Sequence, residues 1–84
     1  MTLEQESRRG EHARRLLEDP LLQEAFAAVE GALREAWATS GDEATTERER
    51  LWLMLKLLAR VRAHVVDALE TGKLAHEQLR ALAG

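Results

Sequence analysis

The stretch LWLMLKLL, residues 51–58, is the most apolar segment of the chain, because seven of its eight residues are hydrophobic. Leu and Met dominate it and favour a helix. A helix that is hydrophobic almost all round over two turns has more than one side to bury, and one antiparallel neighbour covers a single stripe. The remaining sides therefore need another helix of the chain or another subunit, because together they would expose a large apolar patch.

Signals at both ends bound the helix that contains this stretch. Thr45 or Thr46 is the expected N-cap, and Thr46 with Glu49 has the spacing of a capping box. Gly72 is the residue type that commonly ends a helix in a left-handed conformation. The sequence therefore predicts a helix over residues 46–71.

A second long helix is predicted before the loop that starts near Ser40. Asp19 is suited to cap it, and Pro20 suits its first position, where the missing N–H has no partner to lose. Apolar residues then step by four and three, so one seam faces inward and pairs the helix with 46–71 as an antiparallel hairpin over about 20–40. The seam consists of Leu22, Phe26, Val29, Leu33 and Ala36.

Shorter helices are predicted at the two ends of the chain. Thr2 and Gln5 have the spacing of a capping box for a helix over about 3–17, whose thin apolar content predicts the weakest packing in the molecule. A tail helix over about 75–83 follows the expected stop. The predicted fold is all-α: a single domain over residues 1–84, built on a helical hairpin that assembles as an oligomeric bundle or ring.

Composition favours oligomerisation over other means of stabilising a small domain. The chain has 84 residues and no cysteine, so disulfides and thiolate metal sites are excluded. Its 12 Lys and Arg against 15 Asp and Glu give a net charge of -3, which provides no overall attraction to nucleic acid or anionic lipid. No membrane span or secretory signal is recognisable, so the cytoplasm is the expected location.

The apolar block has two interpretations. Its residues are either the core of a monomeric three- or four-helix bundle or a subunit interface, and the excess of apolar surface favours the interface. Trp37 and Trp52 are expected near each other beside the loop, where Trp often anchors binding. The predicted interface residues are Trp37, Leu51, Trp52, Met54, Leu55 and Leu58.

A second set of candidates is cationic. Lys56 interrupts the apolar block, and its simplest role is to pack its stem while the ammonium reaches solvent. Interleaved glutamates suggest that the arginines form solvated, salt-bridged faces, with phosphate binding as the alternative. The candidate phosphate-binding residues are Arg8, Arg15, Lys56, Arg60 and Arg62.

Catalytic, cofactor and metal motifs are not recognisable. His12, His64 and His76 are too far apart to form a helix-borne metal pair, and no nucleophile motif or glycine-rich phosphate loop occurs. We therefore expect a protein that is not an enzyme and that uses no cofactor.

Two runs carry a resemblance to a known group of proteins. RGEHARRLLEDPLLQEAFAAVEGALREAW (9–37) and RERLWLMLKLLARVRAHVVDALETGKLA (48–75) resemble short helical proteins encoded by tailed bacteriophages and prophages. The shared elements are the Asp-Pro helix start, a Trp before the loop and the Leu-rich third helix. The resemblance covers most of the chain and implies virion assembly, an accessory role in DNA packaging, or countering of host defences.

Helical hairpins that assemble into rings are similar to the oligomerisation parts of phage small terminase subunits, although this chain lacks their helix-turn-helix domain. The expected function is thus that of a non-enzymatic oligomer in virion assembly or DNA packaging, in the host cytoplasm or the virion. The expected partners are other copies of the chain and another phage protein. The alternative is an anti-defence or regulatory module that binds a nucleotide, nucleic acid or host protein through its Arg-rich faces.

Overall fold

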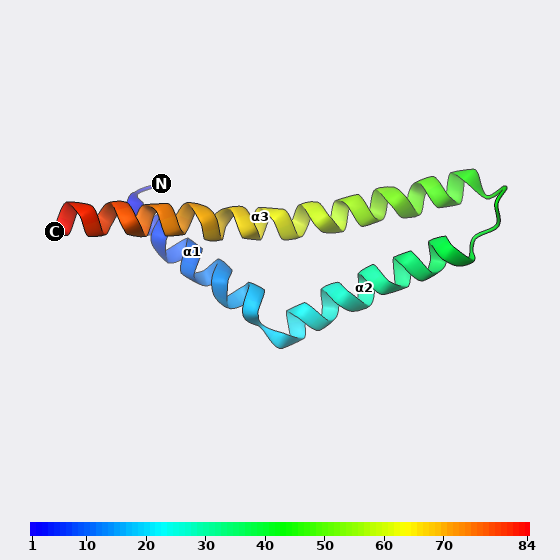
Figure 1. The fold of residues 1–84 in the computed structure, drawn as a ribbon, viewed down its shortest axis with the longest axis horizontal. Coiled ribbons are helices and arrows are strands. Elements are labelled where there is room, and N and C mark those ends of the chain that lie inside the picture. Colours follow the sequence, from blue (N-terminus) through cyan, green and yellow to red (C-terminus); the bar gives the residue numbers. More distant parts are fainter.

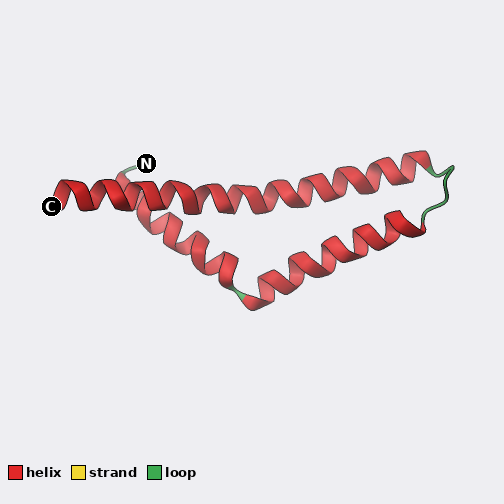
Figure 2. Cartoon of the chain, viewed as in Figure 1, coloured by secondary structure: helices red, strands yellow, loops and turns green.

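The computed structural model describes all 84 residues and contains three helices and no strand (Figure 2). They are α1 (Leu3–Glu18), α2 (Pro20–Thr39) and α3 (Thr45–Ala83). The predicted all-helical architecture is confirmed. None of the three helices combines the length and the apolarity that crossing a bilayer requires.

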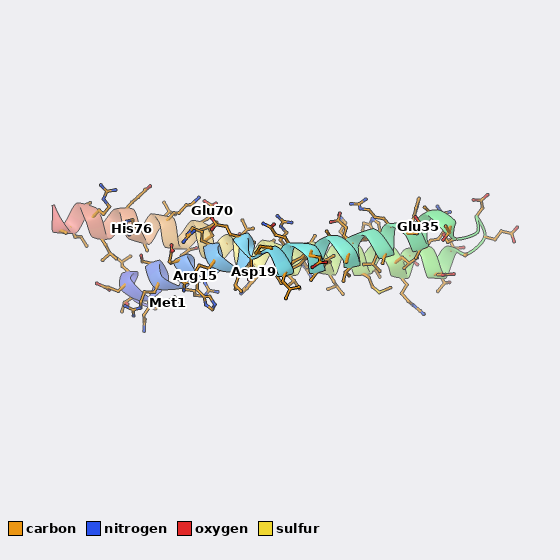
Figure 3. The ribbon with its side chains drawn as sticks, turned by 90° about the horizontal axis from the view of Figure 1, so that it is seen from below. Met1, Arg15, Asp19, Glu35, Glu70 and His76 are labelled. Carbon is orange, nitrogen blue, oxygen red and sulfur yellow. The ribbon has the colours of Figure 1, made fainter.

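The three helices form a hairpin whose first arm is broken. Helices α1 and α2, of 16 and 20 residues, run one after the other against the 39 residues of α3. Figure 1 shows this first arm bending at the junction of α1 and α2, where it stands farthest from α3, and returning toward α3 at the loop. Figure 3 shows α1 on one side of α3 and the end of α2 on the other, so the arm crosses α3 obliquely.

The predicted starts of α1 and α2 are confirmed in atomic detail. The Gln5 amide donates to the Thr2 hydroxyl over 3.1 Å, and the Thr2 amide donates to the Gln5 side chain over 2.9 Å. At α2, the Leu22 amide donates to the Asp19 carboxylate over 3.0 Å, and Pro20 occupies the first turn. Each pairing satisfies backbone amides that the helix leaves without partners.

The predicted end of the third helix at residue 71 is wrong, and so is the separate tail helix over 75–83. Helix α3 continues to Ala83, and no glycine of the chain has a positive φ. Its predicted cap is wrong as well. The N-cap is Ala44, with no side-chain hydrogen bond, and Thr46 lies inside the helix.

A seven-residue repeat explains why α3 runs through Gly72 without a stop. Apolar or small residues recur along two adjacent rows of the helix, which is the pattern of a long helix packed along its whole length. Gly72 is a member of the first row. The rows are Leu51, Leu58, Val65, Gly72 and Leu79, and Met54, Val61, Ala68, Ala75 and Leu82.

Gly72 marks the point where α1 crosses α3. A Cβ built on Gly10 would lie 2.5 Å from the Gly72 Cα, and one built on Gly72 would lie 2.5 Å from the Gly10 Cα. The two backbones are therefore in contact, with Ala13, Ala68 and Ala75 buried beside them. The prediction that α1 packs most weakly is therefore wrong. Its contact with α3 uses small residues in place of large ones, so that the two helices approach closely.

The isolated chain is long and thin. Its extents are 62 × 23 × 15 Å, and its radius of gyration is 18.0 Å, whereas a compact domain of this length has about 12 Å. Only 6 of the 84 residues are buried. Five of these are the small residues at the crossing of α1 and α3, and the sixth is Leu51.

Candidate interaction surface

The apolar block of α3 faces in two directions. Leu51, 7% exposed, points toward α2, and Leu55 and Leu58 on the same side are half-buried. Phe26 and Leu33 of α2 are half-buried as well. These five residues form the inner seam of the hairpin.

A second apolar row of α3 is partly bare. Met54, Val61, Ala68 and Ala75 belong to the same seven-residue row, yet Ala68 and Ala75 are buried under α1, whereas Met54 is 39% and Val61 58% exposed. Leu57, one turn from both, is also 58% exposed. We call Met54, Leu57 and Val61 the α3 stripe. Helix α1 packs on one half of this side of α3, and no helix of the chain packs on the other half.

Helix α2 carries an exposed apolar row of its own, made of small side chains. Ala25, Ala28, Val29 and Ala32 recur by three and four residues, and all four are exposed. The prediction that Val29 belongs to the inward seam is therefore wrong. No residue of α2 is buried. We call these four residues the α2 stripe.

The two stripes lie on the same side of the hairpin. Grooves between α2 and α3 on the other side are lined by Glu30 and Arg34 from α2 and by Arg62 and Trp52 from α3. With 3.6 residues per turn, the α2 stripe falls on the opposite side of its helix from Arg34, and the α3 stripe on the opposite side from Trp52. No stripe residue lines either groove. The hairpin therefore has two different sides: the groove side, which carries both tryptophans and charged residues, and the opposite side, which carries the stripes.

The two tryptophans lie near each other beside the loop, as predicted, and line one groove of about 260 Å³. The Arg48 guanidinium lies 4.3 Å from the centre of the Trp37 ring, and the Lys56 ammonium lies 5.1 Å from that of Trp52. Both cations are within the range of a cation–π contact. The tryptophans thus belong to the groove side of the hairpin and are separate from the stripes.

The six predicted interface residues divide between these locations. Leu51, Leu55 and Leu58 belong to the inner seam, Trp37 and Trp52 to the groove side, and only Met54 to the α3 stripe. The predicted set does not include Leu57, Val61 or any residue of the α2 stripe. The sequence signal for these residues is the spacing of apolar residues by three and four positions. This spacing has to be followed separately for each face of each helix.

The five candidate phosphate-binding residues do not converge. Arg60 and Arg62 point to nearly opposite sides of α3, because two residues along a helix turn by about 200°. Lys56 lies over Trp52, and Arg62 faces the groove between α2 and α3. On α1, Arg8 and Arg15 are two turns apart, and only Arg8 lines a groove. No common anion site results.

The groove beside Arg8 has mixed charge. It holds about 580 Å³ along the crossing of α1 and α3, and it contains Lys73 and Arg80 but also Glu11 and Glu77. Arg14, which lines the same groove, forms ion pairs with Glu11 and Glu18. Its hydrogen bond to Glu11 holds the pKa of that carboxyl below the ordinary value, and the two glutamates raise the pKa of Arg14.

His, Asp and Glu side chains form no group of three that is able to hold a metal ion. Comparisons with protein-family models, with curated proteins and with solved structures gave no match for the chain.

Proposed function

We propose that this chain is a non-enzymatic helical interaction protein that works as an oligomer of its own copies. The observation that supports the proposal is the apolar row of α3, covered by α1 over Ala68 and Ala75 and bare over Met54 and Val61. An exposed apolar stripe with helical spacing is the surface that another helix buries. The α2 stripe beside it widens this surface to two helices.

The size of the exposed area also supports the proposal. The chain exposes 6582 Å², whereas a monomeric globular protein of this mass exposes about 5,000 Å². The excess is about 1,500 Å², and a stable interface takes about 800 Å² from each partner. The first chain therefore exposes enough surface for a second chain to cover, and no part of the first has to unfold.

The small core provides a third argument. Burial of one large aliphatic side chain contributes about 1.5 to 3 kcal/mol, and Leu51 is the only such side chain that is buried. Close helix packing around Gly10 and Gly72 adds contact but little apolar area. Folding of a chain without disulfides then depends on what covers the stripes.

Light scattering coupled to size exclusion tests the proposal. We expect the wild-type chain to elute with a mass at least twice the 9.5 kDa of one chain. Leu57→Glu places a carboxylate in the α3 stripe, where burial without a partner costs several kcal/mol, so this variant should elute as a monomer. Leu57 is preferred to Leu55 for the test, because Leu55 lies in the inner seam, where the same change disturbs the hairpin itself.

Leu74→Glu is the matched control. Leu74 is 62% exposed on α3, on a side of the helix that neither α1 nor the stripe occupies, so its substitution should leave the assembly intact. A wild-type chain that stays a folded monomer at every concentration would overturn the proposal, as would equal masses for the two Glu variants.

The setting that the resemblance implies, virion assembly or DNA packaging in a phage, stays a prediction. So does the alternative of a nucleotide- or nucleic-acid-binding module. The arginines are scattered and form no single site for a nucleotide or nucleic acid. The two stripes, in contrast, form a continuous apolar surface that supports the oligomer.

A further inference from the structure

We infer that the occupant of the two stripes is a second copy of this chain, placed so that the α2 stripe of each copy packs on the α3 stripe of the other. The two loops then lie at the same end of a four-helix arrangement with twofold symmetry. The inference rests on the proposed function and adds to it the number of copies and the pairing of their helices.

Side-chain size selects this pairing. The α3 stripe is made of large residues, Met54, Leu57 and Val61, whereas the α2 stripe is mostly alanine. Large side chains of one helix fit against small ones of its neighbour, and this alternation gives close packing. Pairing α3 with α3 would oppose large residues to large ones, and pairing α2 with α2 would leave small residues facing each other across unfilled space.

Charge selects the same pairing. Glu24 and Glu35 lie along the edge of α2 that borders its stripe. On α3, Arg60 lies at the corresponding edge, and Arg50 lies in line with Leu57, two turns before it. None of these four residues has an ion-pair partner within the chain, where the arginine pairs are those of Arg14 and Arg34. Figure 3 shows Glu35 on α2 toward the loop end of the hairpin.

The register of the hairpin brings these charges to the same level. Within one chain Arg48 lies over Trp37, and Arg34 and Trp52 line one groove, so residues of α2 and α3 whose numbers add up to about 86 are level. A second copy with its loop at the same end keeps these levels. Glu35 then faces the Arg50 of the other copy, and Glu24 faces its Arg60, twice each by symmetry.

Charge reversal tests the pairing. One variant carries Glu24→Arg with Glu35→Arg, and the other carries Arg50→Glu with Arg60→Glu. Each alone opposes four pairs of like charges, so we expect its dimer to dissociate at least tenfold more readily than the wild type. An equimolar mixture restores all four pairs, and we expect native mass spectrometry and sedimentation to find mainly the mixed dimer. Raising the salt concentration should reduce this preference.

A control pair separates this result from a general effect of charge. Glu30→Arg with Arg34→Glu reverses an ion pair on the groove side of the hairpin and should leave the dimer unchanged. Circular dichroism of each variant and of the mixture establishes whether helix is lost. Recovery of both helix and dimer on mixing supports the pairing even where a single variant is unfolded.

Three results would overturn the inference. If the wild type is oligomeric but the mixture is no tighter than its components, the chain assembles through another face, and the proposed function survives alone. If either variant alone dimerises as tightly as the wild type, the stated charges do not face each other. A wild-type chain that is monomeric until a different protein covers it would remove the second copy as the occupant.

Discussion

Gly10 and Gly72 have a role that their residue type does not reveal in the sequence. An interior glycine costs a helix roughly 1 kcal/mol relative to alanine, and it often marks a helix end. Here both glycines lie within helices, and each provides the space that the backbone of the other fills. The penalty in helix propensity is offset by the close approach of α1 to α3.

Alanine substitutions test this role directly. We expect Gly72→Ala to lower the free energy of unfolding by about 1 to 3 kcal/mol, because the new Cβ lies 2.5 Å from the Gly10 Cα and the two helices must separate. Gly31 is the matched control, since nothing lies within 4 Å of the position that a Cβ would take there, and Gly31→Ala should stabilise α2 by about 1 kcal/mol. Denaturant titrations of both variants measure the two effects, and equal shifts would contradict the crossing.

Residue identity alone predicted the starts of α1 and α2 correctly, but the cap of α3 and the role of Gly72 wrongly. Thr2, Gln5 and Asp19 act through bonds to amides within a few residues, so their spacing in the sequence contains the relevant geometry. The conformation of Gly72 depends on Gly10, 62 positions earlier. A pattern of neighbouring residues does not reveal a contact between residues so far apart in the sequence. The interpretation of Gly72 as a helix end was wrong for this reason.

At the level of the helices, the junction of α1 and α2 determines the shape of the first arm. Asp19 ends α1 through a bond from its amide to the Leu16 carbonyl, and it begins α2 by accepting from the Leu22 amide. Pro20 has no N–H to continue the α1 ladder. The arm therefore bends at this point, and α2 starts in a new direction.

Loss of the cap should weaken this junction by a measurable amount. We expect Asp19→Ala to reduce the free energy of unfolding by about 1 kcal/mol, because the Leu22 amide loses its acceptor. Asp42→Ala removes the same side chain from the loop, where no hydrogen bond involves it, and should change stability much less. Thermal unfolding followed by circular dichroism compares the two variants, and similar losses would show that the Asp19 bond contributes little.

Helix boundaries and helix packing differ in how far the sequence predicted them. The period of α2 and its cap gave the helix within one residue of its observed end, since both depend on near neighbours. The side to which each apolar residue belongs depends on which helix lies beside it. The block 51–58 was therefore recognised as having surplus apolar surface, while the division between inner seam and stripe required the arrangement in space.

For the molecule as a whole, the proposed assembly links folding to concentration. A dimer that gains most of its apolar burial from the second copy loses about 1.4 kcal/mol of stability for each tenfold dilution. We expect the Tm of the wild type to fall measurably between micromolar concentrations that differ a hundredfold. Calorimetry or circular dichroism at each concentration provides the measurement. A Tm that is independent of concentration would indicate a chain that folds alone.

The surface that the structure offers was predicted in kind but only partly in location. Met54 is the single predicted interface residue that the α3 stripe contains. In a block with seven apolar residues, the sequence does not distinguish those that face α2 from those that face away from it. Alanines of α2 were overlooked for a different reason. Small side chains contribute little hydrophobicity to a pattern, and their value as a receiving surface appears only when a larger partner is placed opposite.

Figure 1 shows both chain termini at the end of the hairpin opposite the loop. A domain fused to either terminus would therefore lie at this end of the molecule, and the loop end with the two tryptophans would stay free. In the twofold arrangement all four termini emerge at a common pole, so the pair would present its attachments side by side.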